Sequence, residues 1–334
     1  MRSFIIGLGH AGRNLHLRAL RTVRAQARDD RDLAAIFDDA QPLGYDPLPR
    51  PVDGVHLVGS PREALRHTDP RTTMVHLCAP PAARLGPVAE LAELGFRHFL
   101  VEKPLAADAA GARALAVLTR RHGLRLTVVA PWLYSGVTQR IRALAAAGEL
   151  GRIRRISIRQ TKQRSTTGDG TDAHGNAFDV EPPHSVGVAL ELAGDARPTA
   201  AWLRDTPPID GRVVADMGGA GLVLAHRGGV VTDIESDLTA PERVRRIDVE
   251  FEHGKVTGHY SLSADDLSGR VDIEGRPTET FPDDALRTLF LHAYRGSAAD
   301  RLELHCRVVE VLDTARALAH SARVLEPGGE CAAL

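Results

Sequence analysis

A glycine-rich turn close to the start of the chain constrains the fold more than any other feature of the sequence. The apolar run at residues 3–6 leads directly into Gly7-Leu8-Gly9-His10-Ala11-Gly12, and a helical apolar pattern begins at residue 13. In a G-x-G-x-x-G turn the first glycine permits a tight bend, the second lets a pyrophosphate approach the backbone, and the third lets helix and strand pack closely. The start of the helix offers unpaired N–H groups and the positive end of its dipole to the phosphates. The turn therefore predicts dinucleotide binding.

The first 130 residues alternate short apolar runs with helical patterns, which is typical of a doubly wound parallel sheet. We expect strands at residues 3–6, 74–78, 98–101 and 126–129, and helices at about 13–27, 88–94 and 109–121. The acid-rich residues 28–40 carry no pattern that assigns them. This part of the sequence predicts an N-terminal Rossmann domain at residues 1–128.

After residue 131 the pattern changes. Helices are expected at about 137–147, 183–193, 284–295 and 300–322, and a long alternating strand at 153–160. Residues 164–178 are expected to form a mobile loop rich in glycine. Between 199 and 275 the patterns are mostly those of strands, with a hairpin turn at Glu252-His253-Gly254-Lys255. Residues 129–334 therefore predict an α/β domain with a large, mostly antiparallel open sheet covered on one face.

Charge and composition exclude several classes of partner. Lys plus Arg number 42 and Asp plus Glu 43, so the formal net charge of −1 gives no reason to expect nucleic acid or an anionic membrane. No apolar stretch approaches the ~20 residues of a membrane helix, and the N-terminal run is too short for a signal peptide. The distant cysteines Cys78, Cys306 and Cys331 favour free thiols in a reducing cytoplasm. No Cys/His cluster has metal spacing, so no metal is expected.

Two aspartates are candidates for binding the ribose of the dinucleotide. Asp46 follows Leu43-Gly44-Tyr45 and precedes Pro47, as at the end of a strand, whereas Asp38 lies in a run that could equally close a helix. We favour Asp46 and leave Asp38 open. A carboxylate there bonds the ribose diol and repels a 2′-phosphate, which favours NAD over NADP. The nearest basic residue beyond Asp46 is Arg50.

The segment Glu102-Lys103-Pro104 comes directly after the expected strand at residues 98–101. A doubly wound sheet binds its ligands just beyond the carboxyl ends of its strands, so Lys103 is expected where a nicotinamide would react. An ammonium group there can donate to a substrate oxygen and stabilise an alkoxide as hydride leaves. The alternative is a surface lysine in a turn.

These motifs resemble those of the glucose–fructose oxidoreductase and inositol dehydrogenase family. The resemblance rests on GLGHAG at 7–12, VEKPLA at 101–106, LAAAGELG at 144–151 and LAHS at 318–321, and it extends over nearly the whole chain. It implies a Rossmann domain followed by an α/β domain whose open sheet often mediates oligomers, here a homodimer or homotetramer. It also implies NAD(P)-linked oxidation or reduction at a sugar or cyclitol carbon, with Lys103 in the active site.

A second catalytic candidate, His184, is expected near the start of a helix. The family usually has Asp and His four residues apart, but here Val180 stands four before His184 and Asp179 or Glu181 must supply any carboxylate. If the helix begins at Pro182, Glu181 and His184 can face one side, so we predict Glu181 as the closer partner of His184.

Weaker signals surround these residues. Trp132 and Tyr134 follow an expected strand and border either the ligands or the core. Lys162 and Arg164 end the long strand, where they bind an anionic substrate group or lie in solvent. His259 is the alternative proton relay.

Together these signals predict an oxidoreductase that transfers hydride between a nicotinamide and a carbinol or ketone carbon of a sugar, sugar phosphate, nucleoside sugar or cyclitol. The expected catalytic residues are Lys103, His184 and Glu181, with substrate contacts from Lys103, Lys162, Asp179 and His184. The expected cofactor-binding residues are Gly7, Gly9, His10, Ala11, Gly12, Asp46, Ala79, Pro80, Glu102, Lys103 and Trp132. An NAD-dependent glycoside hydrolase, an imine reductase and a non-catalytic NAD-binding regulator remain alternatives.

Overall fold

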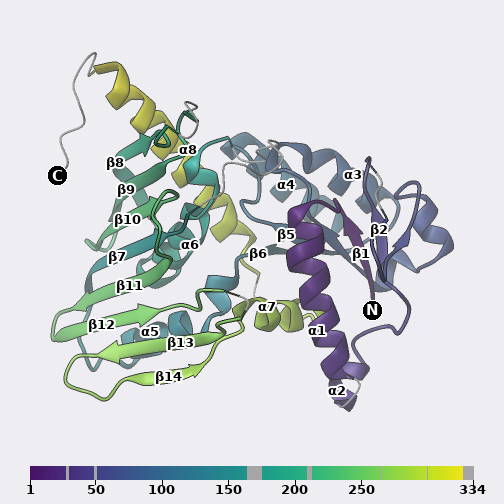
Figure 1. Ribbon diagram of the computed structural model, residues 1–334, viewed down its shortest axis with the longest axis horizontal. Coiled ribbons are helices and arrows are strands. Elements are labelled where there is room, and N and C mark those ends of the chain that lie inside the picture. Colours follow the sequence, from purple (N-terminus) through teal and green to yellow (C-terminus); the bar gives the residue numbers. More distant parts are fainter. Residues whose placement is uncertain are drawn as a thin grey trace. The chain divides into compact units, whose positions relative to one another are not determined.

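The computed structural model describes residues 1–27, 30–48, 51–163, 175–208, 213–263, 265–298 and 300–325 (Figure 1). Arg50, Arg164, Cys331 and most of the expected loop at 164–178 lie outside these residues. The chain divides into two compact units, the first made of Met1–Pro131 with Ala285–Val309 and the second of Trp132–Asp284 with Glu310–Leu334. The segment Ala285–Val309 thus belongs with the N-terminal unit. For the N-terminal part of the first unit, we keep the proposal that the Rossmann domain ends at residue 128 and the second domain begins at residue 129.

The first unit is built on a six-stranded sheet in which every neighbouring pair is parallel. The strand order is β3-β2-β1-β4-β5-β6, the order of a doubly wound Rossmann sheet. The four five-residue strands, β1, β4, β5 and β6, are mostly apolar and mostly buried. This is typical of a parallel sheet, which is covered on both faces. The strands are β1 (Arg2–Ile6), β2 (Leu43–Tyr45), β3 (His56–Leu57), β4 (Thr73–Leu77), β5 (His98–Glu102) and β6 (Arg125–Val129).

The helices of the first unit start and end largely where the sequence predicts. The expected helix at 13–27 begins two residues earlier, and its first part has π-helical hydrogen bonding. The unassigned residues 28–40 contain one helical turn capped by the side chain of Asp30. The elements are η1 (Ala11–Leu17), α1 (Arg18–Ala27), α2 (Arg31–Ala34), η2 (Glu63–Arg66), η3 (Pro70–Thr72), η4 (Pro81–Ala83), α3 (Leu85–Glu93), α4 (Ala109–His122) and α7 (Ala285–Tyr294).

The second unit contains an eight-stranded sheet in the order β14-β13-β12-β11-β7-β10-β9-β8. Neighbouring strands are antiparallel except for the parallel pair of β7 and β10, so the expected mostly antiparallel sheet is confirmed. The predicted hairpin is also confirmed, with Phe251 opposite Gly254. The strands are β7 (Ile153–Thr161), β8 (Ala196–Arg204), β9 (Gly219–His226), β10 (Val231–Asp237), β11 (Val244–Phe251), β12 (Gly254–His259), β13 (Ser268–Ile273) and β14 (Glu279–Pro282).

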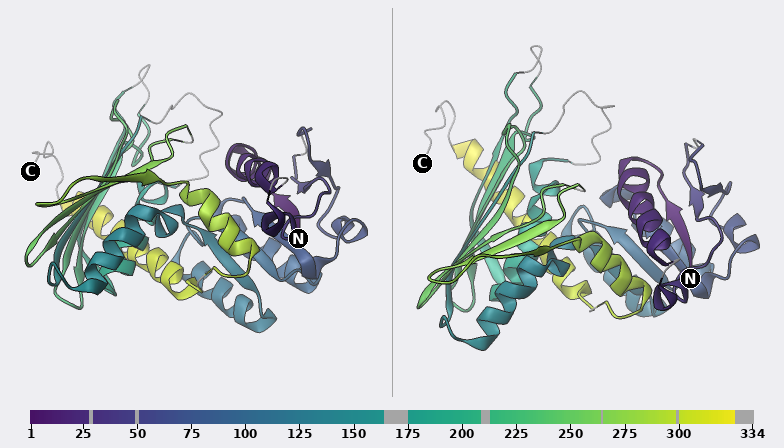
Figure 2. Two further views of the ribbon diagram at one scale, coloured as in Figure 1. Left: turned by 90° about the horizontal axis from the view of Figure 1, so that it is seen from below. Right: turned by 60° about the horizontal axis from the view of Figure 1, so that its bottom comes forward.

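Helices cover one face of this sheet. The helix α6 (Pro182–Ala193) contacts β7 and β10, and α5 (Gly136–Ala147) contacts β12 and β13 (Figures 1 and 2). The covered face is apolar: Ile158, Ile247 and Val256 are almost fully buried. The remaining elements are η5 (Pro131–Tyr134), η6 (Ala177–Asp179) and α8 (Leu302–Leu325), whose first turns belong to the first unit. None of the described helices is both long and apolar enough to cross a membrane.

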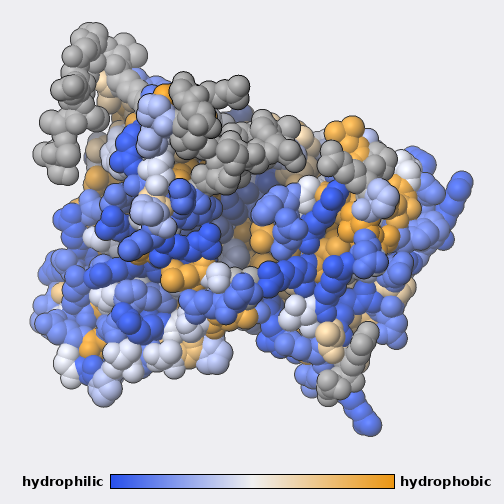
Figure 3. Space-filling view, viewed as in Figure 1, coloured by the Kyte–Doolittle hydropathy of each residue, from blue (hydrophilic) through white to orange (hydrophobic). Residues whose placement is uncertain are grey.

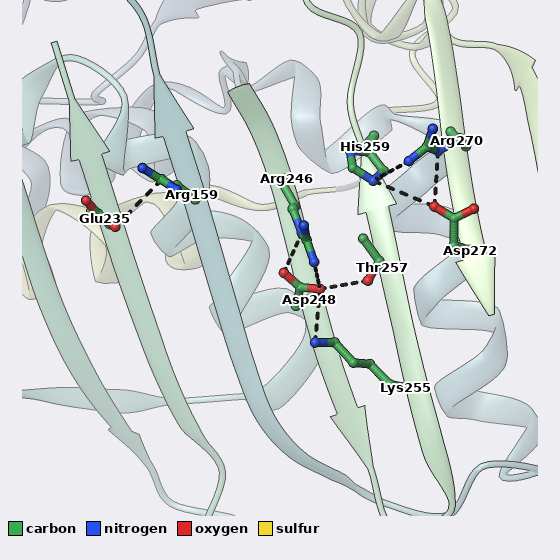
Figure 4. A network of polar contacts seen from close by, with 9 residues as sticks. All are labelled: Arg159, Glu235, Arg246, Asp248, Lys255, Thr257, His259, Arg270 and Asp272. Atoms are coloured by element: carbon green, nitrogen blue, oxygen red, sulfur yellow. Dashed lines mark hydrogen bonds and ion pairs between the residues drawn. The ribbon is translucent and has the colours of Figure 1, made fainter. Parts of the chain in front are cut away.

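The opposite face of the eight-stranded sheet is polar, as the hydrophilic colouring of Figure 3 shows. Side chains alternate between the two faces of a strand, so the residues between the buried ones point to this side. Asp248 accepts hydrogen bonds from Arg246 at 2.7 Å and from Thr257 at 2.7 Å, and lies 3.4 Å from the ammonium of Lys255 (Figure 4). The face therefore carries charges of both signs that already pair within the sheet.

Candidate active site

The three glycines of the N-terminal turn have three different reasons to lack a side chain. Gly7 has a φ of +87° and its N–H donates to the carbonyl of Tyr45 at 2.9 Å. A Cβ at Gly12 would lie 2.1 Å from the carbonyl oxygen of Gly7, whereas a Cβ at Gly9 would meet no atom within 4 Å. The backbone is therefore closed around Gly7 and Gly12 and open at Gly9. Space for a pyrophosphate against the start of the helix fits a dinucleotide.

Two other expected cofactor residues begin the helix. His10 is the N-cap residue of η1 and is exposed, with its Nδ1 3.0 Å from the side-chain nitrogen of Asn14. Ala11 is the first residue of η1. Both therefore lie directly after the open position at Gly9.

Of the two aspartates, Asp46 lies beside the glycine turn. It follows β2, and its Oδ2 accepts a hydrogen bond from the N–H of Leu8 at 2.6 Å. Asp38 has different surroundings, since its N–H donates to the carbonyl of Met1 and its Oδ1 accepts from Ala40. Only Asp46 therefore stands at the carboxyl end of a strand next to the turn.

The carboxyl ends of β4 and β5 meet through a buried arginine. Ala79 and Pro80 follow β4, and Arg84, which is 2% exposed, donates from Nε to the carbonyl of Ala79 at 2.9 Å. Its Nη atoms donate to the carbonyls of Lys103 and Pro104. Burial lowers the pKa of Arg84 to about 10, against the opposing effect of the nearby Glu102 and Cys78. Sequence reasoning missed Arg84, because an arginine after Pro-Pro-Ala-Ala has the pattern of a surface loop.

Glu102 is the last residue of β5 and Lys103 follows it. Glu102 is buried, and its carboxylate accepts hydrogen bonds from His16 at 3.0 Å and from the N–H of Lys103 at 3.1 Å. Burial raises the pKa of this carboxyl, but the hydrogen bond and charge of His16, with the charges of Lys103 and Arg84, lower it to about 2. Glu102 is therefore an ionised group directed into the unit, and the half-buried Lys103 stands at the carboxyl edge of the sheet.

In the second unit, His184 lies in the first turn of α6, as predicted. The ring of Trp132 stacks on that of His184 with centroids 6.0 Å apart, and on that of Tyr260 at 3.9 Å. The hydroxyl of Tyr260 lies 2.9 Å from Oγ1 of Thr138 on α5, and burial raises the pKa of this phenol. Trp132, expected to border the ligands, thus holds the imidazole against an aromatic stack. The sequence did not predict this stack of Tyr260 on Trp132.

The carboxylates near His184 have other partners as well. Glu181 is 6% exposed; one of its oxygens forms an ion pair with Lys162 and the other accepts from Nε2 of Gln160 at 2.9 Å. Asp179 accepts from Arg316 of α8 at 2.8 Å and from the N–H of Gly175 at 3.0 Å. The structure therefore brings Lys162 and Glu181 together, which their separate expected roles did not anticipate.

His259 lies on the polar face of the sheet. Its Nε2 is 2.9 Å from the guanidinium of Arg270 and 3.7 Å from Asp272 (Figure 4). Tyr260 points to the opposite, helix-covered face because neighbouring residues of a strand alternate. His259 is thus directed away from the aromatic stack that holds His184.

A Rossmann sheet with an open glycine turn, followed by a unit with a large one-sided sheet, defines a dinucleotide-binding protein of two units. Residues 1–130 match the family model GFO_IDH_MocA, described as an oxidoreductase family with an NAD-binding Rossmann fold. Residues 1–130 are thus similar to this oxidoreductase family, and the resemblance expected from the sequence is confirmed over this part of the chain. No curated protein matches the sequence.

Three solved structures share the fold over most of the chain. KijD10, a 3-ketoreductase from Actinomadura kijaniata solved with NADP and TDP-benzene, has a TM-score of 0.73 and 19% identity, covering 95% of this chain and 97% of its own. UDP-N-acetylglucosamine 3-dehydrogenase from Acidithiobacillus ferrooxidans has a TM-score of 0.70 and 18% identity, covering 96% and 97%. Levoglucosan dehydrogenase, solved with NADH and L-sorbose, has a TM-score of 0.73 and 15% identity, covering 96% and 98%. At these identities the likeness shows the fold alone.

Proposed function

We propose that the protein is an NAD-linked dehydrogenase or reductase acting at a carbinol or ketone carbon of a sugar, sugar phosphate, nucleoside sugar or cyclitol. The observation that carries the proposal is the position of Lys103 directly after β5. Only β4 separates β5 from β1, whose end forms the glycine turn, so the lysine follows a strand end close to the dinucleotide turn. Ligands of doubly wound sheets bind at this edge. The sugar and nucleotide-sugar enzymes that share the fold support the substrate class.

The residues of the first unit would hold the cofactor. The open backbone at Gly9 and the start of η1 suit the pyrophosphate, Asp46 suits the ribose, and Ala79 and Pro80 suit the ring side of the molecule. When bound, the nicotinamide supplies the hydride chemistry. We propose NAD as the preferred form because the Asp46 carboxylate repels a 2′-phosphate.

The protein's own residues would handle the proton and the charge on oxygen. In the oxidation direction, Lys103 donates a hydrogen bond to the substrate oxygen and stabilises the developing alkoxide. His184 accepts the hydroxyl proton, with its ring oriented by the stack on Trp132. Glu181 assists as a buried carboxylate at the start of α6, and Asp179 remains the alternative partner of His184.

The polar face of the eight-stranded sheet is the surface through which we propose that two or more copies associate. Its charges of both signs suit an isologous contact, in which the same patch meets itself. Light scattering should give the mass of a dimer or tetramer, and the double variant E235R/D272R, which makes the face more basic, should give a smaller species. A wild-type monomer would refute this association, and an unchanged mass of the variant would place the contact elsewhere.

A substrate screen tests the proposed activity. The purified protein is mixed with NAD or NADP and a panel of sugars, sugar phosphates, nucleoside sugars and cyclitols, and the formation of reduced cofactor is recorded. We expect reduced cofactor to accumulate with at least one polyhydroxylated compound. Hydrolysis of a glycoside without net reduced cofactor would instead identify a hydrolase, and binding of NAD without turnover would indicate a regulator.

A further inference from the structure

A line of buried polar side chains lies inside the first unit, connecting the end of β5 to α7. Nε2 of His16 is 3.0 Å from Glu102, and Nδ1 of His16 is 2.8 Å from Nδ1 of His76. Nε2 of His76 lies 2.7 Å from the hydroxyl of Tyr294, which lies 2.5 Å from Oγ of Ser3. This series of hydrogen bonds joins η1, β5, β4, α7 and β1.

The cost of burying these groups indicates that their arrangement is specific. His16 and His76 are completely buried, and the ring of Phe290 packs against both imidazoles at 5.3 Å. A polar group removed from water is expensive unless it is hydrogen-bonded, and a charged group is more expensive. An apolar core would have avoided this cost. The series of polar residues ends at Glu102, whose carboxylate also accepts the N–H of Lys103.

Donor and acceptor requirements restrict where the protons lie. The Glu102 carboxylate only accepts, so Nε2 of His16 carries a hydrogen. The contact between the two Nδ1 atoms needs one hydrogen, which either imidazole could supply. If His16 is an imidazolium, it donates through both nitrogens, and His76 is neutral and donates from Nε2 to Tyr294. If His16 is neutral, its Nδ1 accepts from Nδ1 of His76, and Nε2 of His76 then accepts from the hydroxyl of Tyr294.

The surrounding charges favour the imidazolium form of His16. Cys78 and Glu102 interact with this ring, and the positive charges of Lys103 and Arg84 act on Glu102. Burial lowers the pKa of His16, but Cys78 and Glu102 more than offset it and raise the pKa to about 10. Burial and the neighbouring charge of His16 lower the pKa of His76 well below its usual range. These effects favour His16 over His76 as the charged member of the pair.

Glu102 transmits this arrangement to the backbone of Lys103. The carboxylate that His16 holds accepts the N–H of Lys103 at 3.1 Å, and Arg84 donates to the carbonyls of Lys103 and Pro104. The backbone on both sides of the Lys103 side chain is thus fixed by two buried groups.

We propose that His16 is a positioning residue for the reaction: as the imidazolium partner of Glu102, it fixes the carboxylate that sets the backbone of Lys103. This inference rests on the proposed role of Lys103 in stabilising the substrate alkoxide. His16 touches neither substrate nor cofactor in this account. It acts through Glu102, and His76 and Tyr294 complete its hydrogen bonding.

A measurement on the wild-type chain tests the charge state without any need for turnover. In the full-length protein labelled with ¹⁵N-histidine, His16 should show both ring nitrogens protonated at about pH 8, where an ordinary histidine is neutral. His76 should show a single proton, on Nε2. The variant E102Q should lose the imidazolium signal of His16 at that pH. A neutral His16 in the wild-type protein would overturn the proposal.

Kinetics then test the positioning role. H16Q keeps an N–H donor but removes the charge, and we expect kcat to fall on the order of 10²-fold, with little change in the dissociation constant of NAD. H122Q, on the distant end of α4, is the control and should leave kcat unchanged. The double variant H16Q/K103M should be no slower than K103M, because His16 acts through Lys103.

The double variant separates the two proposals. If K103M alone is fully active, the assignment of Lys103 fails, whatever His16 does. If K103M is slow and H16Q slows it by the same factor again, Lys103 stands and the positioning role of His16 is refuted. If H16Q does not fold, the ¹⁵N measurement on the wild-type chain still decides the charge state on which the proposal depends.

Discussion

Lys162 and Glu181 form an ion pair at the start of α6, although the sequence assigns them to different tasks. The second oxygen of Glu181 accepts from Gln160, which in turn accepts from the hydroxyl of Ser185 at 2.7 Å. Three of these four side chains are nearly fully buried, and Lys162 is about a quarter exposed. The pair therefore ties the end of β7 to the helix that carries His184.

Removing Lys162 should destabilise the protein. K162M takes the Lys162 cation away from the buried Glu181 carboxylate, which keeps its hydrogen bond from Gln160, so we expect a loss of up to about 3 kcal/mol in the free energy of unfolding. The double variant K162M/E181Q removes both charges and should recover part of the loss. K255M is the matched control, since its ion pair lies on the polar face and should cost less than about 1 kcal/mol. Urea unfolding measures the free energy of unfolding of the three variants. Equal losses for K162M and K255M would contradict a larger contribution of the buried ion pair to stability.

The aromatic stack should control how well His184 works. Y260F keeps the ring on Trp132 but removes the hydrogen bond to Thr138, so we expect a loss of stability of about 1 kcal/mol and little change in kcat. W132A removes the support of His184 and should lower kcat strongly. H184A should nearly abolish oxidation at neutral pH, with partial recovery as hydroxide replaces the base. An unchanged pH–rate profile in H184A would exclude His184 as the proton relay.

Folding stability should have a maximum near pH 6.5. The folded pKa of His16 is raised from 6.5 to about 10, so its stabilisation is complete below pH 6.5 and is lost as the pH rises toward 10. His76 has the opposite effect because its folded pKa is lowered. Below pH 6.5 the unfolded chain binds a proton at His76 that the folded chain does not, so stability falls as the pH falls. The pKa of Glu102, lowered from 4.5 to about 2, adds a loss of stability as the pH falls from 4.5 toward 2. Thermal melts across this range measure the profile, and E102Q should flatten its alkaline side.

The cofactor preference should depend on Asp46. D46N keeps an acceptor for the N–H of Leu8 but removes the charge that repels a 2′-phosphate, so the ratio of kcat/KM for NAD to that for NADP should fall on the order of tenfold. D38N is the control and should leave the ratio unchanged, because Asp38 hydrogen-bonds away from the turn. A wild-type enzyme that works equally well with NADP would contradict the assignment of Asp46.

Local features could be predicted from the sequence, whereas distant partners could not. The glycine turn and the position of Lys103 follow from a few adjacent residues and from the alternation of strands and helices. The partners of His16 lie 60 and 86 residues away, so nothing near His16 in the sequence marks it as part of a hydrogen-bonded pair. The π-helical geometry of η1, which precedes α1, has no sequence signature.

Contacts between residues far apart in the sequence also decide to which unit a late segment of the chain belongs. The segment Ala285–Val309 belongs with the first unit, in which Phe290 packs on His76 and Tyr294 packs on Phe37. Periodicity shows that residues 284–295 form a helix but not which sheet the helix covers. The ion pair of Lys162 with Glu181 was missed for a related reason, since a lysine at the end of a strand has the pattern of a solvated residue.

The effect of K103M on turnover is the most direct test of the role of Lys103 in stabilising the substrate alkoxide. Methionine keeps most of the length of the lysine stem and removes the donor to the substrate oxygen. With the substrate found in the screen, kcat should fall by a factor on the order of 10² or more, while the dissociation constant of NAD changes little and K255M behaves as wild type. Near-normal turnover of K103M would contradict the account and show that this lysine is structural.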